Sequence, residues 1–188
     1  MNKYDIAVIG AGPAGYNCAI NFAKKGKKVV IIEKYNLGGT CLNRGCIPTK
    51  FLWQAASVKQ TISKSYEYGL KSSLEPVNFQ EIINKKNKLV ENLVKGVARL
   101  LTVNKVDVIK GTASFKNKNE LNIKTETEEI NISAGKIIIA TGSESKSIPN
   151  IEYDHQKYID STDALNLTEV PKTMLVIGAG AIGIELSS

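Results

Sequence analysis

Histidine, tryptophan and cysteine are scarce in this sequence, which holds one, one and three of them among its 188 residues. Structural zinc sites use four nitrogen or sulfur ligands, so one pair of nearby cysteines with one other cysteine and one histidine disfavours zinc. No run of 18 apolar residues is present, which argues against a transmembrane helix. The first apolar segment is too short for a signal peptide, and we therefore expect a cytoplasmic chain.

Acidic residues are also fewer than basic ones, with 18 Asp and Glu against 25 Lys and Arg and a net charge of +7. The lysines are scattered, without a basic block or interleaved aromatic residues, so neither nucleic acid nor a membrane is an expected partner. A hydrophobic fraction of 43% allows a substantial core. A chain of this length has room for about one to one-and-a-half domains.

A nucleotide-binding pattern opens the chain. Residues 5–9 form an apolar run that predicts a buried parallel strand. Gly10, Gly12 and Gly15 follow, then a predicted helix over residues 13–25 and a second strand over residues 28–32 that ends at Glu33. These glycines allow a tight turn, a close approach to a pyrophosphate and helix–strand packing, and the acid can bind ribose hydroxyls. The pattern predicts a dinucleotide site; Cys18, within the helix, is expected to pack in the core.

The segment 38–50 carries the other two cysteines, Cys41 and Cys46, among glycines. In a regular helix they would lie about 140° apart around the axis and could not pair. Pro48 favours a helix that begins between Cys46 and Pro48, after a loop or distorted turn over residues 38–45 that brings the cysteines together. A helix N-terminus and the nearby Lys50 would favour a Cys46 thiolate. The pair can be a redox-active dithiol, a structural disulfide or two unrelated buried cysteines.

The middle of the chain contains helices and a small sheet. Helices are predicted over residues 49–69 and 79–101. Apolar residues recur at helical spacing in the second, and we expect the two helices to form an antiparallel pair. Short strands are predicted over residues 106–109, 121–124, 129–132 and 136–140, the second and third antiparallel and the last buried. A polar linker follows, and His155 at its edge is either a general base or, as we favour, a solvated linker histidine.

A second glycine pattern closes the sequence. Residues 174–177 predict another strand, and Gly178, Gly180, Gly183 and Glu185 repeat the spacing of the first pattern. The chain stops at Ser188, before a second strand and its ribose-binding acid. We therefore expect a truncated chain.

These motifs together resemble the flavin-dependent pyridine nucleotide–disulfide oxidoreductases over residues 4–185. The segment 38–50 is the most specific feature, and its Leu42-Asn43 and Ile47-Pro48 pairs are most similar to the dihydrolipoamide dehydrogenase branch. Arg44 stands where valine is more usual in this family, and Thr49 stands where serine or lysine is more usual. The resemblance implies an α/β fold: a Rossmann-like FAD-binding domain with a parallel sheet, a small antiparallel sheet and a long helix pair (residues 1–145), a linker (146–170) and the start of a Rossmann-like NAD-binding domain (171–188).

The resemblance also assigns roles. Cys41 would be the interchange thiol that meets dihydrolipoamide, Cys46 the thiol beside the flavin, and Lys50 the residue at its reactive edge. NAD would be bound from Gly178, Gly180, Gly183 and Glu185. FAD would be bound by Gly10, Gly12, Pro13, Ala14, Gly15, Glu33, Lys34, Gly39, Thr40, Lys50, Ala113, Ala140, Thr141, Gly142 and Ser143.

The activity implied is oxidation of dihydrolipoamide through a Cys41–Cys46 disulfide and FAD, with NAD as hydride acceptor. The implied partners are lipoyl-bearing proteins of 2-oxoacid dehydrogenase or glycine cleavage complexes, with a homodimer when intact and a role in cell redox homeostasis. The family's catalytic histidine and glutamate belong to a C-terminal domain, and His155 does not match that base. We therefore expect little turnover. The alternatives are a non-catalytic FAD-binding fragment and a related glutathione- or mercuric-reductase-like enzyme.

Overall fold

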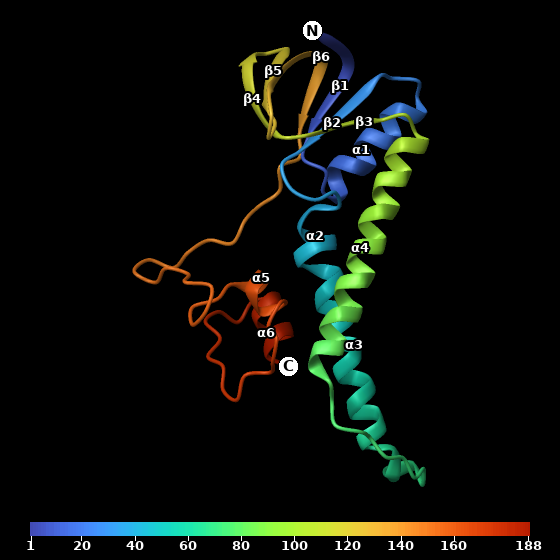
Figure 1. The fold of residues 1–188 in the computed structure, drawn as a ribbon, viewed down its shortest axis with the longest axis vertical. Helices are drawn as coiled ribbons and strands as arrows, with labels where there is room; N and C mark the ends of the chain where they lie inside the picture. Colours follow the sequence, from blue (N-terminus) through green and yellow to red (C-terminus); the bar gives the residue numbers. More distant parts are fainter. The chain divides into compact units, whose positions relative to one another are not determined.

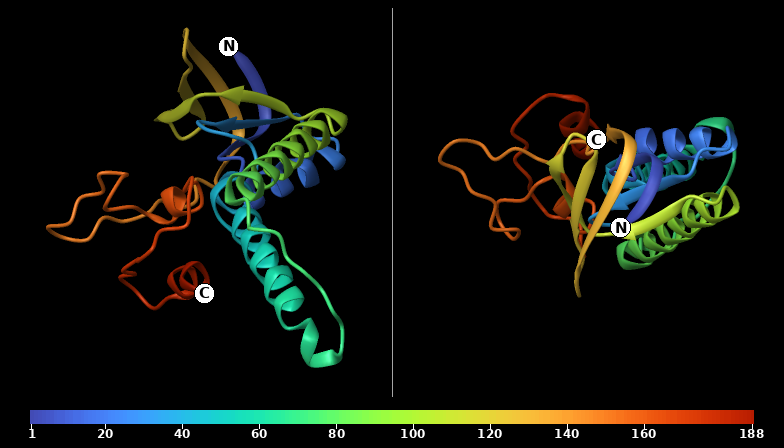
Figure 2. Two further views of the ribbon diagram at one scale, coloured as in Figure 1. Left: turned by 60° about the horizontal axis from the view of Figure 1, so that its bottom comes forward. Right: turned by 90° about the horizontal axis from the view of Figure 1, so that it is seen from above.

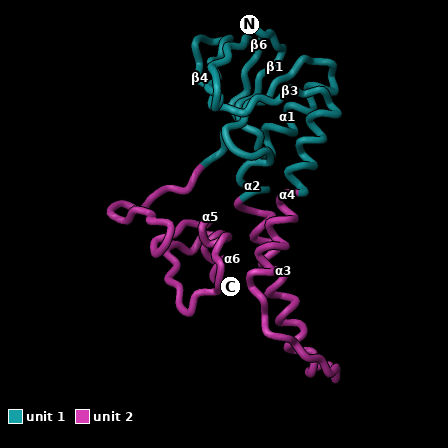
Figure 3. Tube along the Cα trace, in the orientation of Figure 1, with its two compact units in different colours: residues 1–43, 92–143 teal, residues 44–91, 144–188 magenta.

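The structure is a computed structural model that describes residues 1–188. Figure 1 gives the order of the helices and strands along the chain. The chain divides into two compact units, coloured separately in Figure 3. Unit 1 contains residues 1–43 and 92–143, and unit 2 contains residues 44–91 and 144–188. Each unit is described by itself below.

Unit 1 is built on one six-stranded sheet in the order β3-β2-β1-β6-β5-β4. Its neighbours β3–β2, β2–β1 and β1–β6 are parallel, whereas β6–β5 and β5–β4 are antiparallel. The strands are β1 (Asn2–Ile9), β2 (Val29–Glu33), β3 (Asp107–Lys110), β4 (Thr112–Asn117), β5 (Glu120–Lys124) and β6 (Glu129–Ile139). The predicted parallel and antiparallel parts are both confirmed, and β6 joins them into one sheet.

Strand β6 differs from the prediction in its length and in its burial. The separate strands predicted over residues 129–132 and 136–140 are one continuous strand, which pairs with β5 at its start and with β1 from Ile132 to Ile139. The segment predicted as buried is instead partly open, since Ile139 is 67% exposed. The continuity of β6 arises because it pairs with a strand on each side, which the local sequence cannot indicate.

Side-chain alternation along the strands separates two apolar layers. Val8, Val29 and Ile31 point to one face, where they cluster with residues of α1 (Pro13–Lys24) and of the C-terminal part of α4 (Phe79–Val103). Figure 2 shows α1 beside β1 and β2. Ala7, Val30 and Ile32 point to the opposite face and cluster with β5 and β6. Burial on both faces is the reason why residues 6–9 of β1 and residues 29–32 of β2 are continuous apolar runs.

Unit 2 consists of helices and irregular segments. It contains α3 (Cys46–Ser63), the short η1 (Ser65–Tyr68), the N-terminal part of α4, α5 (Ser161–Ala164) and α6 (Ala181–Ser187). The two long helices predicted from periodicity are therefore present. Helix α2 (Gly39–Arg44) precedes α3. No helix of the chain combines the length and the hydropathy that crossing a bilayer would require.

The strand predicted over residues 174–177 is not formed. These residues have no regular secondary structure, and Leu175 and Ile177 are 86% and 63% exposed. Unit 2 contains no strand that could pair with them beyond an isolated bridge between Ile148 and Ile151. A lone strand leaves its backbone hydrogen bonds unmade, so an apolar sequence alone does not produce one.

Candidate functional site

The first glycine turn lies at the carboxyl end of β1 and leads directly into α1. Gly10 has φ +101° and donates its N–H to Ile32 O at 2.7 Å. A Cβ on the buried Gly15 would lie 1.8 Å from Gly10 O, so only glycine lets α1 start this close to the turn. Pro13 occupies the first turn of α1, where its missing N–H is not needed.

Gly12 leaves open space beside this turn. A Cβ on Gly12 would meet only the Cα of Gly39, at 3.8 Å. A Cβ on Gly39, which has φ +60°, would lie 2.5 Å from Gly12 Cα, so the two backbones touch. Main-chain N–H groups at a helix start attract phosphate. This glycine-lined cradle therefore fits the pyrophosphate of a dinucleotide.

Glu33 is positioned at the end of β2, beside the same turn. It is 9% exposed, and its two carboxylate oxygens accept separate backbone hydrogen bonds, from Ala11 N at 2.6 Å and Tyr35 N at 2.8 Å. Each oxygen keeps further acceptor capacity. The side chain is therefore held in place and still suited to ribose hydroxyls. The bond from Ala11 was not foreseen, because the spacing of residues 11 and 33 carries no signal for it.

The remaining predicted FAD residues of unit 1 lie around the same edge of the sheet. Ala140 N donates to Ile9 O at 2.8 Å, and a Cβ on Gly10 would lie 2.3 Å from Ala140 O. Gly111 N donates to Glu33 O at 2.9 Å just before Ala113 on β4. The exposed residues Thr141, Gly142 and Ser143 continue from Ala140. Lys34 lies over the Tyr35 ring, 4.6 Å from its centroid, and Thr40 is exposed on α2.

Cys41 and Cys46 form a disulfide, and Cys18 is free and half-buried. Cys46 is the first residue of α3, as predicted, and Cys41 lies on α2. Gly45 interrupts the two helices with φ −147° and ψ −112°, which frees the cysteines from regular helical spacing. The loop or distorted turn predicted over residues 38–45 is helical from Gly39 to Arg44, and the Asn43 side chain donates to Leu37 O and Gly39 O at 2.9 and 3.0 Å.

The start of α3 carries Cys46 together with charged groups of unit 2. Cys46 is exposed and lies at the helix N-terminus, where backbone N–H groups favour an anion. Thr49 anchors this turn through both its N–H and its hydroxyl, which donate to Gly45 O at 3.1 and 2.7 Å. Lys50 forms an ion pair with Glu185 of α6, and the two side chains are 59% and 39% exposed. The predicted flavin-edge lysine and a residue of the second glycine pattern therefore meet within one unit.

The second glycine pattern repeats the geometry of the first. Gly178 has φ +113°, and a Cβ on Gly183 would lie 2.2 Å from Gly178 O. Gly180 caps α6 with φ −75° and ψ 174°, against φ −70° and ψ −178° for Gly12 at α1. Ile184 N donates to Gly180 O at 3.0 Å, as Tyr16 N does to Gly12 O. The turn and the helix start are present even though the preceding strand is not.

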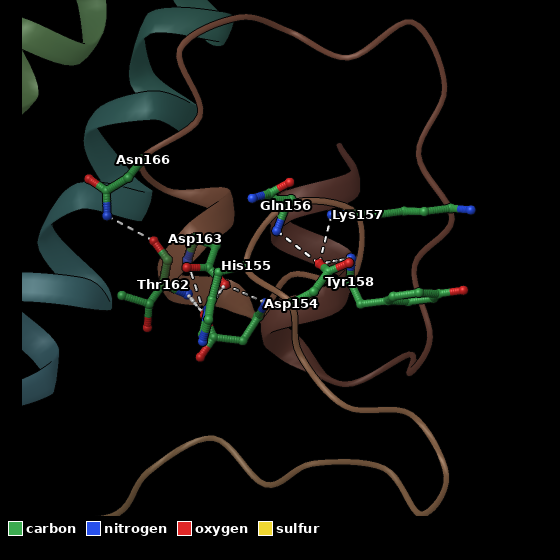
Figure 4. Close-up of polar contacts among 9 residues, drawn as sticks. Asp154, His155, Gln156, Lys157, Tyr158, Thr162, Asp163 and Asn166 are labelled. Carbon is green, nitrogen blue, oxygen red and sulfur yellow. Dashed lines mark hydrogen bonds and ion pairs between the residues drawn. The ribbon is translucent and has the colours of Figure 1, made fainter.

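His155 lies in a polar cluster of the connecting segment, shown in Figure 4. It has φ 59°, its side chain is 67% exposed, and its Nδ1 lies 2.9 Å from Asp163 Oδ2. The hydrogen bond and the charge of Asp163 raise the pKa of His155. Asp154 Oδ1 accepts backbone hydrogen bonds from three following residues, Gln156, Lys157 and Tyr158. His155 is thus an exposed connector residue, as favoured, and has an acidic partner that the sequence did not indicate.

The sequence is similar to those of known flavoprotein disulfide reductases. The model of the pyridine nucleotide-disulphide oxidoreductase family matches residues 4–188. The chain is 40% identical over 182 residues to a dihydrolipoyl dehydrogenase of Bacillus subtilis, covering 96% of this chain and 40% of the relative. It is 43% identical over 190 residues to a leghemoglobin reductase of Vigna unguiculata, covering 100% of this chain and 36% of the relative.

A solved structure is also similar. The copper(II) complex of a cysteine-to-serine mutant of RclA, an HOCl-induced flavoprotein disulfide reductase from Escherichia coli, matches with a TM-score of 0.83 and 34% identity. The match covers 100% of this chain and 40% of that one. The chain therefore spans about two-fifths of the length of these proteins.

Proposed function

The chain belongs to the pyridine nucleotide-disulphide oxidoreductase family, and from this premise we propose that it is the FAD- and disulfide-bearing portion of an enzyme that oxidises dihydrolipoamide. The observation that carries the proposal is the Cys41–Cys46 disulfide at the N-terminus of α3. The same chain also contains the glycine cradle and Glu33, whose carboxylate is held in place beside that cradle and can bind ribose hydroxyls.

The cysteine pair takes two electrons from the substrate by thiol–disulfide exchange. A thiolate of dihydrolipoamide attacks Cys41 Sγ, which forms a mixed disulfide and breaks the Cys41–Cys46 bond, so that Cys46 leaves as a thiolate. The second substrate thiol loses its proton to solvent, and the resulting thiolate attacks the substrate sulfur of the mixed disulfide. Oxidised lipoamide leaves with its own disulfide closed, Cys41 is released, and the electron pair remains on the two cysteines.

The residues near Cys46 favour this direction of attack. A low-pKa thiol is the better leaving group, and a helix N-terminus with Lys50 four residues on stabilises the Cys46 anion. FAD, when bound, would supply the acceptor for this electron pair, and we propose NAD as the final hydride acceptor. The pyrophosphate and ribose of FAD would be held by Gly10, Gly12, Gly15 and Glu33. The site for NAD would begin with Gly178, Gly180, Gly183 and Glu185.

The proposal extends to the partners. The lipoyl group would be carried by proteins of 2-oxoacid dehydrogenase or glycine cleavage complexes, and the intact enzyme would act as a cytoplasmic homodimer. A second function, FAD binding without turnover, is favoured by one observation. The segment 174–177 forms no strand, so only the turn of the proposed NAD site is built.

Flavin uptake by the purified chain tests the cofactor. The chain is mixed with excess FAD and desalted, and the retained visible absorbance is measured for the natural sequence, Gly12→Ala and Gly96→Ala. The backbone of Gly12 accepts alanine and its Cβ would touch nothing closer than 3.8 Å, so Gly12→Ala should fold normally and lose at least about tenfold in FAD affinity through its clash with the pyrophosphate. Gly96→Ala, in open space on α4, should retain FAD. Equal FAD affinity in all three proteins would contradict the cradle.

Anaerobic addition of dihydrolipoamide to the FAD-loaded chain tests the redox pair. Appearance of long-wavelength absorbance in the natural sequence, and its absence in Cys46→Ser, would place a Cys46 thiolate beside the flavin. Subsequent bleaching of that absorbance by NAD and formation of NADH would support the enzyme, whereas a stable reduced form would support binding without turnover. A flavin that is unchanged by dihydrolipoamide would refute the proposed substrate.

A further inference from the structure

Lys86 is a buried cation that the proposed function does not use. It lies on the part of α4 that belongs to unit 2 and is 2% exposed. Its Nζ donates to the backbone oxygen of Leu165 and to Asn166 Oδ1, the latter at 3.1 Å. Both acceptors are neutral, and burial lowers the pKa of Lys86. An apolar side chain of similar volume would avoid the desolvation penalty, so the two directed hydrogen bonds are what lysine contributes here.

The acceptors of Lys86 lie at the C-terminal end of α5. This helix is fixed at its start by Asp160, whose Oδ1 accepts from Thr162 N and Asp163 N at 2.8 and 3.0 Å. Asn166 is held from both sides, because its Nδ2 donates to Thr162 O at 2.8 Å while its Oδ1 accepts from Lys86. Leu165, between these groups, is 2% exposed. Lys86 therefore attaches a short, internally braced helix to α4.

Helix α5 leads to the charged pair beside the disulfide, and every step lies within unit 2. Helix α5 contacts α6, and α6 contacts α3. Glu185 of α6 pairs with Lys50 of α3. Lys50 is four residues after Cys46 on the same helix, so its Cβ lies about 6 Å from that of Cys46. The place of α5 thus bears on how fully Glu185 neutralises Lys50.

We propose that Lys86 is a positioning residue: by anchoring the end of α5, it holds α6 where Glu185 pairs with Lys50 and thereby sets the electrostatic field at Cys46. The inference rests on the proposed function in that it gives Cys46 a redox role. It predicts a sign. Loss of the anchor frees Lys50 from Glu185 and makes the Cys46 thiolate more stable, whereas the direct effect of removing a cation would make it less stable.

The test measures the Cys46 thiol without any cofactor. Each protein is reduced, the reductant is removed, and the rate of alkylation of Cys46 by iodoacetamide is followed against pH by mass spectrometry of the cysteine peptides. In Lys86→Met the midpoint should fall by about 0.2 to 0.7 of a pH unit, the size expected for a partly exposed charge pair. Glu185→Gln should give the same fall, and the double variant should give no further fall.

The matched control is Lys88→Met, which removes the same charge from an exposed position two residues along α4. Its midpoint should not fall. If circular dichroism shows that Lys86→Met does not fold, Asn166→Ala decides the question, because it removes one acceptor of Lys86 from an exposed residue and should lower the midpoint by a smaller amount. An unchanged or raised midpoint, or additive effects with Glu185→Gln, would overturn the proposal. Since no flavin is present, absence of flavin uptake would refute the proposed function alone.

Discussion

The replacement of Gly15 by alanine offers a direct test of the first glycine turn. The added Cβ would lie 1.8 Å from Gly10 O and 2.9 Å from Gly10 C. Real Cβ contacts are essentially never below 3.0 Å, and the obstructing atoms belong to the backbone, which has no rotamer to change. Gly10 is itself fixed, since its N–H is bonded to Ile32 O at 2.7 Å. Helix α1 must therefore move away from the sheet.

This movement is costly because α1 shares the apolar layer of unit 1. Ala19 and Ile20 of α1 pack there with Val8 and Val29 of the sheet. Overpacking a rigid site costs about 1–3 kcal/mol, and partial loss of the packing of α1 adds to it. We expect Gly15→Ala to lower the free energy of unfolding by about 3 kcal/mol.

Gly96→Ala is the matched control, because Gly96 also lies on a helix and in unit 1. A Cβ there would meet nothing within 4 Å. Alanine is favoured over glycine within a helix, so this variant should gain about 0.5–1 kcal/mol. Urea titration followed by far-UV circular dichroism, with hydrogen exchange of unit 1 amides, measures both changes. If Gly15→Ala were as stable as the natural sequence, the close packing of α1 on the turn would be refuted.

Two titrations test the electrostatics of the structure. Burial, and then the hydrogen bond and charge of Asp107, raise the pKa of Tyr4 to about 12; phenolate absorbance should show one late tyrosine that is lost in Tyr4→Phe and titrates earlier in Asp107→Asn. Asp163 raises the pKa of His155, and because this is the single histidine its ring signals in a proton NMR titration belong to one residue. Asp163→Asn should lower that pKa towards about 6.5; an unchanged value would exclude the pair in solution. Because the pKa of His155 is raised in the folded state, protonated His155 stabilises the fold. This stabilisation is fully present below about pH 6.5 and is lost as the pH rises through the pKa of the folded state.

The sequence predicted those features that depend on near neighbours. Glycine spacing predicted the turn at Gly10 to Gly15, and Pro48 predicted a helix start within residues 46–48, where α3 begins at Cys46, because both effects act within one helical turn. The Glu33 carboxylate was placed correctly beside the turn because a parallel β-α-β unit returns its second strand to the first. Each of these predictions used residues less than 25 positions apart.

The features that the sequence did not predict depend on distant partners. Strand β6 is continuous because β1, more than a hundred residues earlier, pairs along it. Lys86 is buried because Leu165 and Asn166, 79 and 80 residues later, supply its acceptors. A lysine in an amphipathic helix ordinarily lies on the solvent face, and no local pattern distinguishes Lys86 from its exposed neighbours Lys85 and Lys88.

The two glycine patterns separate local from long-range causes most clearly. Both form the same turn, with positive φ at Gly10 and Gly178 and no room for a Cβ at Gly15 or Gly183. The first follows a strand paired on both sides, whereas the second follows residues 174–177, which form no strand. The sheet is therefore not needed to shape the turn, because glycine freedom and helix capping are sufficient. What the sheet adds is a fixed place for that turn relative to an acid such as Glu33. A second ribose site thus requires strand pairing for residues 174–177, even though its phosphate-binding turn is already formed.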